Sequence, residues 1–557
     1  MLLSRLLRPS RRPFLAFTST RCASSAPPRS PPVPPSFSRA GHGAVVSDRM
    51  ARGPGIKAVG GDGVAKVTGE KKAEEQPSRP QPQELLTVLE ETIKTHGPLP
   101  ISRYMTLCLQ HPTLGYYTTR TVFGKEGDFV TSPEISQVFG ELLGIWFVTQ
   151  WLAQGSPRKV RIVELGPGKG TLLADILRTF RALPAPSRPP ISSIHLIETS
   201  PALRAIQRAK LSEAGCGDVP TRWYGDVKEV PKAGETDEFT VLVAHEFFDA
   251  LPIHVFEHTQ KGWREVLVDV ADPKSIVSPS APRDPLRLVL APSPTPASAL
   301  YSSLAALAAP SVAHQLQPDL NSAAPKRLTP TPGLGAALNV DTTLGFPPSP
   351  PSPSSLSSSS PAPPGPAAAA LDPAHSLTAQ RFARLPIGSR IEVSPSSWEV
   401  ARDVAALIGS AEGEAREGAG GAGLVVDYGD AKAFGRSWRG FRKHQVVDPL
   451  SEPGHTDLTA NVDFSYLAEA MGDFVSTHGP LTQTRFLTSL GLQPRLAALL
   501  RAAPTEERRK EIESAARRLV DMGGMGGQYR VMGVTPRRAK EGREEEKGEG
   551  VFPFDLE

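Results

Sequence analysis

Cysteine, net charge and long apolar runs are all scarce in this chain of 557 residues. Cysteine occurs only at Cys22, Cys108 and Cys216, and neither the odd number nor the spacing fits a disulfide framework or a cysteine-based metal site, which favours a reducing compartment. The net charge of +4 falls partly in the basic first residues and indicates no nucleic-acid partner. No uninterrupted apolar run reaches the roughly 18 residues of a membrane-spanning helix, so we expect no transmembrane segment.

Acidic residues are absent from the start of the chain, where none precedes Asp48. Arginine recurs in the same stretch, at Arg5, Arg8, Arg11, Arg12 and Arg21. This composition is typical of a mitochondrial transit peptide, which we place at residues 1–40 and which predicts the mitochondrial matrix as the location; a disordered basic tail is the alternative. Residues 41–82 are rich in glycine, proline, serine and charge and are expected to form a disordered linker.

Proline is abundant, with 57 residues, but it is unevenly distributed. The Pro/Ser/Ala-rich runs of residues 291–378 cannot bury enough apolar surface to offset the entropy of ordering, so we predict a disordered insertion there, with a docking segment for a partner as the alternative. The insertion divides an α/β domain at 153–290 and 379–535. A helical subdomain at 83–152 is expected before it and a charged tail at 536–557 after it.

The segment VRIVELGPGKGTLLADILRTF, from Val160 to Phe180, predicts a buried strand, a glycine turn and an amphipathic helix in succession. Glycines at 166, 168 and 170 let the backbone approach a ligand, and the helix N-terminus offers unpaired N–H groups. The glycine spacing fits neither a phosphate loop nor the usual dinucleotide fingerprint. Glu164 could attract the amino group of S-adenosylmethionine. A tight connection without a ligand is the alternative.

Acidic residues follow successive predicted strands along the chain. Glu198 ends the strand Ile194–Ile197 and is expected to bind ribose hydroxyls, while Asp226 and Val227 follow in WYGDVKEV beside the adenine of such a ligand. His245, Glu246 and Asp249 follow the apolar strand FTVLVAH. Because strand ends of an open α/β sheet share one crevice, we expect Glu164, Glu198, Asp226, Glu246 and Asp249 to converge.

Further segments carry less specific patterns. GKEGDFVTSPEIS, with Gly124 and Asp128, could be a lid over a ligand or an ordinary surface loop capped by Ser132. Trp263–Val270 and Leu286–Leu290 are expected to pair as strands, and QYRVMGV to form a final edge strand. The candidates for the substrate side of the crevice are His444, His455, Asp457, Asn461 and Asp463.

Together these blocks resemble the MidA family. The resemblance rests on GPLPISRYMTLCLQHPTLGYYTTR, GDFVTSPEISQVFGELLGIW, VELGPGKGTLLADILR, HLIETSP, HEFFDALPIHVF, VVDYG and DLTANVDFSYLAEA, in this order. It covers about residues 83–290 and 385–534. Much of the family pattern has asparagine where this chain has His245.

The resemblance implies a Rossmann-like class I methyltransferase sheet with S-adenosyl-L-methionine as methyl donor. It further implies a protein arginine methyltransferase that symmetrically dimethylates the 49-kDa core subunit of mitochondrial complex I and serves in complex I assembly. A non-catalytic assembly chaperone and a small-molecule or lipid methyltransferase are the alternatives. The expected catalytic residues are Glu246, Asp249 and His245. The expected cofactor-binding residues are Glu164, Gly166, Gly168, Gly170, Glu198, Asp226, Val227, Gly124 and Asp128, and no metal ligand is expected.

An acidic pocket is required because arginine has a pKa of roughly 12.5 to 13.8, so a free neutral guanidine near pH 8 would cost about 6 to 8 kcal/mol. Glu246 and Asp249 are the candidates for localising the charge and receiving the proton. The alternative is that Asp249 caps the following turn and Glu246 holds it.

Overall fold

The computed structural model describes residues 82–119, 131–272, 285–308, 376–410, 420–537 and 550–556, which all lie in one compact unit, Arg79–Glu557. The transit peptide, the linker up to residue 81, the residues Gly124 and Asp128, and most of the insertion therefore lie outside the described residues. The helices of the described residues include none long and apolar enough to span a membrane.

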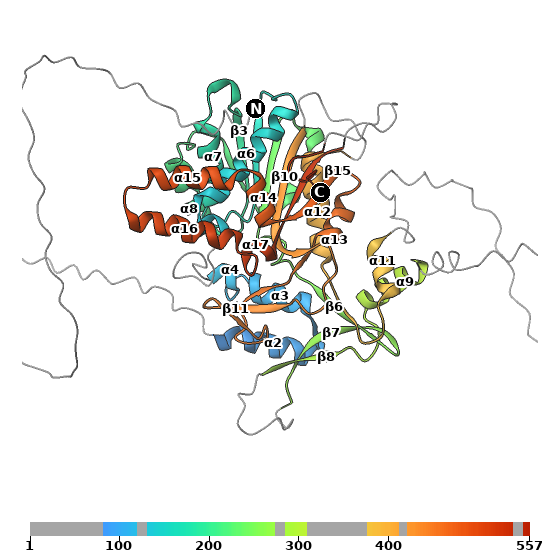
Figure 1. Ribbon diagram of the computed structural model, residues 1–557. Helices are drawn as coiled ribbons and strands as arrows, with labels where there is room; N and C mark the ends of the chain where they lie inside the picture. The colour runs from blue at the N-terminus through green and yellow to red at the C-terminus, as the bar shows by residue number, and fades with distance from the viewer. Residues whose placement is uncertain are drawn as a thin grey trace, which may run out of the picture. The chain divides into compact units, whose positions relative to one another are not determined.

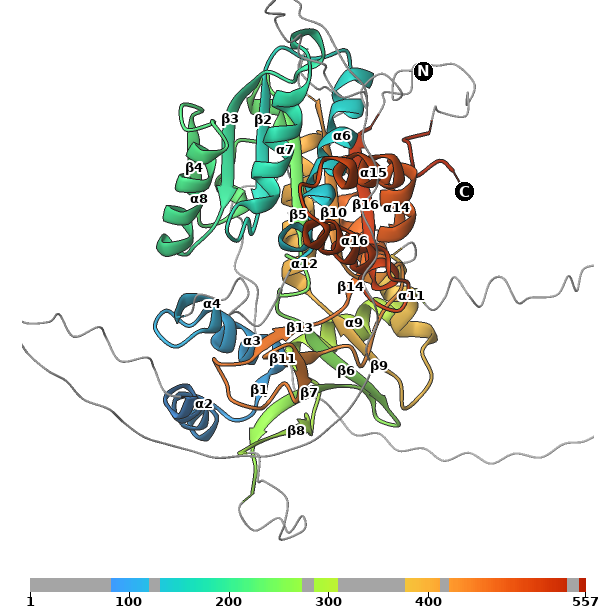
Figure 2. The same cartoon turned by 60° about the vertical axis from the view of Figure 1, so that its left-hand side comes forward.

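An eight-stranded sheet forms the core, and five of its strands, β10, β5, β2, β3 and β4, run parallel in this order (Figure 2). The strands are β2 (Val160–Leu165), β3 (Ile191–Ile197), β4 (Thr221–Tyr224), β5 (Phe239–His245), β10 (Gly420–Asp430), β14 (Val462–Asp463), β15 (Val475–Thr482) and β16 (Tyr529–Pro536). This arrangement confirms the predicted Rossmann-like sheet.

The predicted place of QYRVMGV at the sheet edge is wrong. The segment forms β16, which lies between β10 and β15 and runs antiparallel to both. The edge strand is β15, whose register shifts between His478 and Leu481 around Gly479 and Pro480. Proline has no backbone N–H to donate to a strand ladder, so it is tolerated in an edge strand. The same Gly-Pro pair interrupts the strand pattern in the sequence, so β15 is not predicted.

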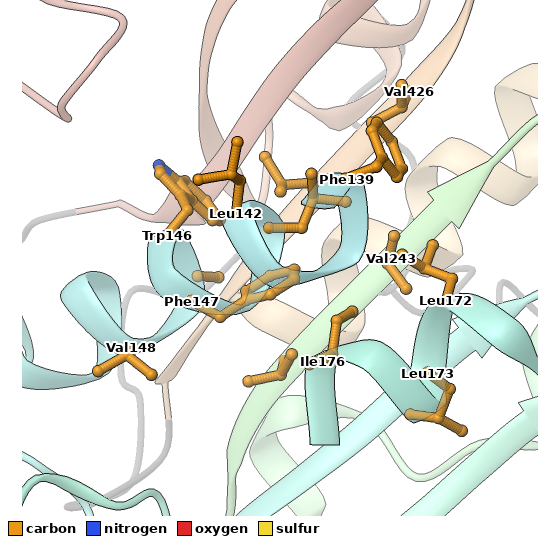
Figure 3. Packing of buried hydrophobic residues seen from close by; sticks show 14 of the residues in the cluster. Phe139, Leu142, Trp146, Phe147, Val148, Leu172, Leu173, Ile176, Val243 and Val426 are labelled. Atoms are coloured by element: carbon orange, nitrogen blue, oxygen red, sulfur yellow. The ribbon is translucent and has the colours of Figure 1, made fainter. Parts of the chain in front are cut away.

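Helices cover both faces of this sheet because its central strands are apolar on both sides. Val241 and Val243 of β5 pack with helices α6 (Gln137–Ala153) and α7 (Thr171–Ala182), as Figure 3 shows for Val243. Leu242 and Ala244 pack with α12 (Pro395–Ile408) and α13 (Phe464–Met471) on the opposite face. Parallel strands buried in this way read as continuous apolar runs.

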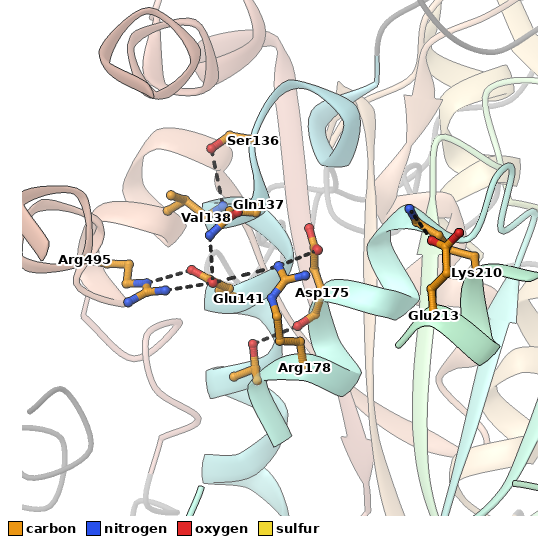
Figure 4. A network of polar contacts seen from close by, with 10 residues as sticks. Ser136, Gln137, Val138, Glu141, Asp175, Arg178, Lys210, Glu213 and Arg495 are labelled. Atoms are coloured by element: carbon orange, nitrogen blue, oxygen red, sulfur yellow. Dashed lines mark hydrogen bonds and ion pairs between the residues drawn. The ribbon is translucent and has the colours of Figure 1, made fainter. Parts of the chain in front are cut away.

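Polar contacts join α6 to the neighbouring helices (Figure 4). Arg495 donates to both carboxylate oxygens of Glu141 in α6, at 2.7 and 2.8 Å, while Asp175 and Arg178 of α7 pair at 2.6 Å. The remaining helices on the α6 and α7 side of the sheet are α8 (Pro201–Glu213), α14 (Gln483–Ser489), α15 (Leu492–Ala502), α16 (Glu506–Val520) and α17 (Met525–Gln528). The short helix η1 (Ala185–Ser187) follows α7, and η3 (Ala233–Glu235) contacts α12 on the opposite face.

A second, five-stranded antiparallel sheet lies below the first in Figure 1. Its strands are β1 (Leu99–Pro100), β6 (His254–Thr259), β7 (Gly262–Val270), β8 (Leu286–Leu290) and β9 (Arg390–Val393), and the predicted pairing of β7 with β8 is confirmed. Helices α2 (Pro82–His96) and α3 (Ile101–Gln110) pack on one face. The helices expected over 83–152 thus divide between two sheets, since α6 is apolar on nearly all sides and packs in the main core.

The other face of the second sheet is covered by α9 (Pro296–Ala308) and α11 (Leu377–Arg384). Tyr301 of α9 stacks on Phe382 of α11, with ring centroids 4.9 Å apart, and both contact Phe256 of β6. The predicted start of the disordered insertion at residue 291 is therefore wrong, because this Ala- and Leu-rich stretch forms a packed helix.

A small three-stranded sheet completes the described fold. It contains β11 (Arg439–Arg442), β12 (Gln445–Val447) and β13 (Asp457–Thr459), and the short helices α4 (Tyr116–Thr119) and α5 (Ser132–Ile135) precede the main domain. Leu458 of β13 packs in the same cluster as α2 and α3. The predicted cap by Ser132 is wrong: Ser132 lies inside α5, and Ser136 instead accepts a hydrogen bond from Val138 N at the start of α6.

Candidate functional site

A cavity of about 590 Å³ lies at the carboxyl ends of the parallel strands. Its lining includes most of the residues predicted for the site, namely Glu164, Gly166, Gly168, Glu198, Asp226, Val227, His245, Glu246 and Asp249. Gly170 does not line it. The strand order places Glu198 and Asp226, after β3 and β4, on one side of the glycine turn and Glu246 and Asp249, after β5, on the other.

The glycine turn between β2 and α7 depends on backbone conformations that side chains disfavour. Gly166, Gly168 and Gly170 have φ values of +62°, +52° and +77°. The carbonyl of Gly168 accepts a hydrogen bond of 2.7 Å from Gln207 Nε2, which fixes the turn against α8. Gly170 is the N-cap of α7, so its role is to begin the helix. The turn leaves backbone exposed to the cavity at Gly166 and Gly168.

Glu164, at the end of β2, is the clearest sign of a cationic ligand. Its side chain is 3% exposed, and Oε2 is buried without a hydrogen-bond partner in the described residues. Burial raises the pKa of this carboxyl to about 8. A buried carboxylate without a partner is costly, and the charged amino group of a ligand would offset that cost.

Glu198 and Asp226 are already held by protein donors. Glu198 Oε1 accepts from Ser200 N at 2.8 Å and Oε2 accepts from Gln207 Nε2 at 3.2 Å, while burial raises the pKa of the carboxyl. Asp226 caps the short helix η2 (Val227–Glu229) by accepting from Lys228 N at 3.0 Å. Both carboxylates are thus oriented at the cavity wall, where Glu198 retains acceptor capacity for the predicted ribose hydroxyls and Asp226 for the predicted adenine edge.

Glu246 has an unusual backbone and a buried carboxyl. Its φ of +50° is in the left-handed region, and its Oε1 accepts a hydrogen bond of 2.7 Å from the Tyr529 hydroxyl. Burial is the main cause that raises the pKa of Glu246 to about 8. His245 Nε2 lies 3.6 Å from Glu246 Oε1 and has no hydrogen-bond partner in the described residues. Burial lowers the pKa of His245 to about 3, so its ring is neutral at physiological pH.

Asp427, at the end of β10, organises the loop that carries these residues. Its Oδ2 accepts hydrogen bonds from the backbone N–H groups of Phe247, Phe248 and Asp249, at 3.1, 3.0 and 3.3 Å. Burial and the neighbouring Asp249 and Glu246 raise the pKa of Asp427, whereas the N–H donors oppose this by favouring the charged form. The sequence marks Asp427 only as a strand-end acid, so its positioning of the loop could not be predicted.

Of the five residues predicted for the substrate side, only Asp457 lines the cavity. Asp457 Oδ1 accepts from the Tyr117 hydroxyl at 2.9 Å, and Tyr117 also lines the cavity. Asn461 and Asp463 instead line a separate cavity of about 40 Å³. His444 and His455 line neither; His444 lies in the turn between β11 and β12 with a φ of +62°. Tyr117 carried no pattern that would have identified it.

The cavity is strongly acidic. Its lining carries one lysine, Lys169, which lies 3.4 Å from Glu134. The carboxyl groups in the lining are those of Glu134, Glu164, Glu198, Asp226, Glu246, Asp249 and Asp457. Among the described residues, no group of three or more His, Cys, Asp or Glu side chains is arranged to hold a metal ion. The acidic lining suits organic cations.

S-adenosylmethionine fits this arrangement. The ligand has a net positive charge, a ribose and an adenine, and it needs close approach of the backbone. Gly166 and Gly168 would allow the approach, Glu164 would accept from the amino group, Glu198 would accept from ribose hydroxyls and Asp226 would lie beside the adenine. Of the four remaining acids in the lining, Glu134 pairs with Lys169, and Glu246, Asp249 and Asp457 would be left for a second cation.

Comparisons with known proteins agree with this assignment. A family model described as "Putative S-adenosyl-L-methionine-dependent methyltransferase" matches residues 142–350 and 353–481. Among similar proteins, "Protein arginine methyltransferase NDUFAF7, mitochondrial" of Bos taurus is 33% identical over 468 residues, covering 81% of this chain and 83% of the relative. The protein of the same name from Homo sapiens is 32% identical, covering 83% of this chain and 86% of the relative.

A solved structure shares the fold. The COG1565 superfamily member from Burkholderia thailandensis, crystallised with S-adenosyl-homocysteine, has a TM-score of 0.56 and 22% identity, covering 82% of this chain and 92% of that chain. At this identity the likeness concerns the architecture of the chain rather than its substrate.

Proposed function

The chain belongs to the family of S-adenosyl-L-methionine-dependent methyltransferases whose model it matches, and on this premise we propose that it methylates arginine in a protein substrate. The observation that carries the proposal is the excess of carboxyl groups in the cavity beyond those suited to the cofactor. A guanidinium is a planar cation with several N–H donors and suits such a group of acceptors. The printed name of the relatives from Bos taurus and Homo sapiens supports the same substrate class.

In the proposed reaction the residues of this chain hold the guanidinium and accept the proton that it releases at each methyl transfer. When bound, S-adenosylmethionine supplies a methyl group from its sulfonium sulfur. Transfer of this methyl group leaves the sulfur as a neutral thioether. The guanidinium nitrogen that gains the methyl group must release a proton, and Glu246 is the group that we assign to accept it. Tyr529 donates to Glu246 Oε1 and holds the carboxylate in place. Asp249 localises positive charge beside it, and His245 contributes a neutral, buried Nε2.

The finer substrate assignment rests on the resemblance of the sequence motifs. We propose the 49-kDa core subunit of mitochondrial complex I as the protein partner and symmetric dimethylation as the product. The relatives' names contain the word mitochondrial, which supports residues 1–40 as a transit peptide and the mitochondrial matrix as the location. The proposed cofactor contacts of Glu164, Gly166, Gly168, Glu198, Asp226 and Val227 belong to the same account.

A replacement experiment in cells tests the function. Cells that lack the native protein receive the wild-type chain, Glu246→Gln or Asp249→Asn, and both arginine methylation of the 49-kDa subunit and assembled complex I are measured. Glu246→Gln keeps the shape of the side chain and leaves the proposed cofactor contacts intact. We expect both variants to bind S-adenosylhomocysteine and to lose both methylation and assembly.

The outcomes separate the alternatives. Lost methylation with normal assembly would favour a non-catalytic assembly chaperone. Retained assembly and unchanged methylation of the subunit, with loss of methylated small molecules, would favour a small-molecule methyltransferase. Either result would contradict the proposal.

A further inference from the structure

The acidic part of the cavity is built from two separate parts of the fold. Asp249 comes from the loop after β5 in the main sheet, whereas Asp457 begins β13 of the small sheet. The two parts are joined by hydrogen bonds: the Thr459 hydroxyl donates to Asp249 Oδ2 at 2.8 Å, and Ala460 N donates to the Asp249 carbonyl at 3.0 Å. β13 is therefore fixed against the loop that carries Glu246.

The side chains of Asp457 and Asp249 lie close together in the lining of the cavity. Asp457 and Thr459 are two residues apart on a strand, so their side chains share one face, roughly 7 Å apart, and Thr459 touches Asp249. Tyr117 lies close to both acids. Burial raises the pKa of its phenol, and the negative charges of Asp457 and Asp249 raise this pKa further. Tyr117, Asp249 and Asp457 all line the cavity. The same cavity is lined by Glu164 and His245, whose Oε2 and Nε2 atoms are buried without a hydrogen-bond partner in the described residues.

We propose that Asp249 and Asp457 hold the target guanidinium from two sides, with the ring of Tyr117 as part of the wall, and that Asp457 selects arginine against lysine. This inference rests on the proposed function. A guanidinium presents N–H donors along more than one edge of a rigid plane, so it can serve two carboxylates at once. An ammonium is a compact, strongly hydrated charge, and it gains less from two acceptors in fixed positions. The Tyr117 hydroxyl orients Asp457 through the hydrogen bond to Oδ1.

The test measures binding of two defined cations to the full chain saturated with S-adenosylhomocysteine. Ethylguanidinium and propylammonium are similar in size and are titrated separately by calorimetry. We expect the wild-type chain to bind ethylguanidinium about tenfold or more tightly than propylammonium. Asp457→Asn should remove about tenfold or more of the ethylguanidinium affinity and little of the propylammonium affinity, and Asp457→Glu should restore part of the preference.

Asp269→Asn is the matched control, because Asp269 is paired with Arg287 in the second sheet and does not line the cavity. It should leave both affinities unchanged. If Asp457→Asn also loses S-adenosylhomocysteine binding, the guanidinium preference is measured in Tyr117→Phe instead. This variant removes only the hydroxyl that orients Asp457. A weaker guanidinium preference in Tyr117→Phe supports the proposal, and an unchanged preference overturns it.

The role of Asp457 and the choice of arginine as substrate can be tested separately. Unchanged ethylguanidinium affinity in a folded Asp457→Asn variant would overturn the role of Asp457 while arginine remains the proposed substrate. If the wild-type chain binds propylammonium and ethylguanidinium with equal affinity, or binds neither, the arginine assignment is overturned and with it the role of Asp457.

Discussion

Glu246 adopts a conformation that a residue with a side chain rarely takes. Its φ of +50° costs free energy, and such outliers persist where the surrounding structure enforces them. Here the neighbouring contacts do so: Glu246 N donates to Val426 O at 2.9 Å, and the carboxylate accepts from Tyr529. The strained residue is also the proposed proton acceptor, so its backbone places the carboxyl where the proton is released.

The raised pKa of Glu246 predicts a pH dependence of the reaction. Because burial raises this pKa to about 8, the free enzyme at pH 7 holds the carboxyl mainly in its neutral form, which cannot accept a proton. We expect kcat/KM for the protein substrate to increase as pH rises from about 7 to 9, since this parameter reports the free enzyme. The measurement is a pH profile of the initial rate. A flat profile in this range for the wild-type chain would contradict the assignment.

Asp427 is predicted to act through the loop rather than on the substrate. Asp427→Asn keeps the shape but replaces one of two acceptor oxygens by an NH2 group that cannot accept from backbone N–H groups, so we expect the free energy of unfolding in urea to fall by about 1 to 3 kcal/mol and kcat to fall. Asp430→Asn is the control, because Asp430 forms a partly exposed pair with Arg530 at 3.1 Å and should change stability by about 1 kcal/mol or less. Equal effects of the two substitutions would show that the loop does not depend on Asp427.

The residues of the site are predictable from the sequence where a local rule applies. Acids at strand ends are enough to bring Glu164, Glu198 and Glu246 together, because the carboxyl ends of parallel strands share one edge of the sheet. Tyr117 and the hydrogen bonds of Asp427 are not predictable in this way. They depend on contacts between segments that lie far apart in sequence, and no local pattern in either segment indicates its partner.

At the scale of elements, α6 and α7 approach each other closely at Gly140. A Cβ added there would lie 2.5 Å from the Cβ of Asp175, which is buried in the facing helix. Gly140→Ala should therefore lower the free energy of unfolding by about 1 to 3 kcal/mol, although alanine favours helix. Gly234→Ala is the control, since nothing lies within 4 Å of its added Cβ. The measurement is thermal and urea unfolding; a Gly140→Ala chain as stable as the control would contradict this packing.

The packed helix α9 lies within the predicted insertion, so the effect of a deletion should depend on where it begins. Removing residues 297–373 would take away Tyr301, which stacks on Phe382, and should lower the melting temperature and the soluble yield. Residues 310–374 lie outside the described residues and are predicted from the sequence to be a disordered insertion. Removing them leaves α9 in place, and on that prediction it should change little, because loop length enters closure entropy only logarithmically. The two deletions are compared by thermal unfolding and by S-adenosylhomocysteine affinity. Equal stability of both would mean that α9 contributes nothing.

Elements are predictable from the sequence where periodicity is strong. The strands β2 and β5 and the helix α7 follow their apolar patterns. α9 escapes prediction because its alanines and serines resemble the low-complexity runs that follow, and its order depends on Phe256 and Phe382. β15 escapes prediction because Gly479 and Pro480 interrupt it.

At the scale of the whole described unit, one cavity contains both the proposed cofactor site and the proposed substrate site. The main sheet supplies the glycine turn and the loop with Glu246 and Asp249, while the small sheet and α4 supply Asp457 and Tyr117. The proposed cofactor part consists of the glycine turn and of acids at the ends of neighbouring parallel strands, and such local patterns make it predictable. The substrate part is assembled from distant segments, and its specificity therefore depends on the tertiary fold.

The central claim is that this cavity transfers a methyl group to arginine and that Glu246 accepts the released proton. The most direct measurement uses the purified chain, S-adenosylmethionine with an isotopically labelled methyl group, and isolated 49-kDa subunit, with the product identified by mass spectrometry. We predict label on arginine with the wild-type chain, and none with Glu246→Gln although that variant still binds S-adenosylhomocysteine. Equal labelling by both chains would contradict the role of Glu246, and absence of labelled arginine with a cofactor-saturated wild-type chain would contradict the claim itself.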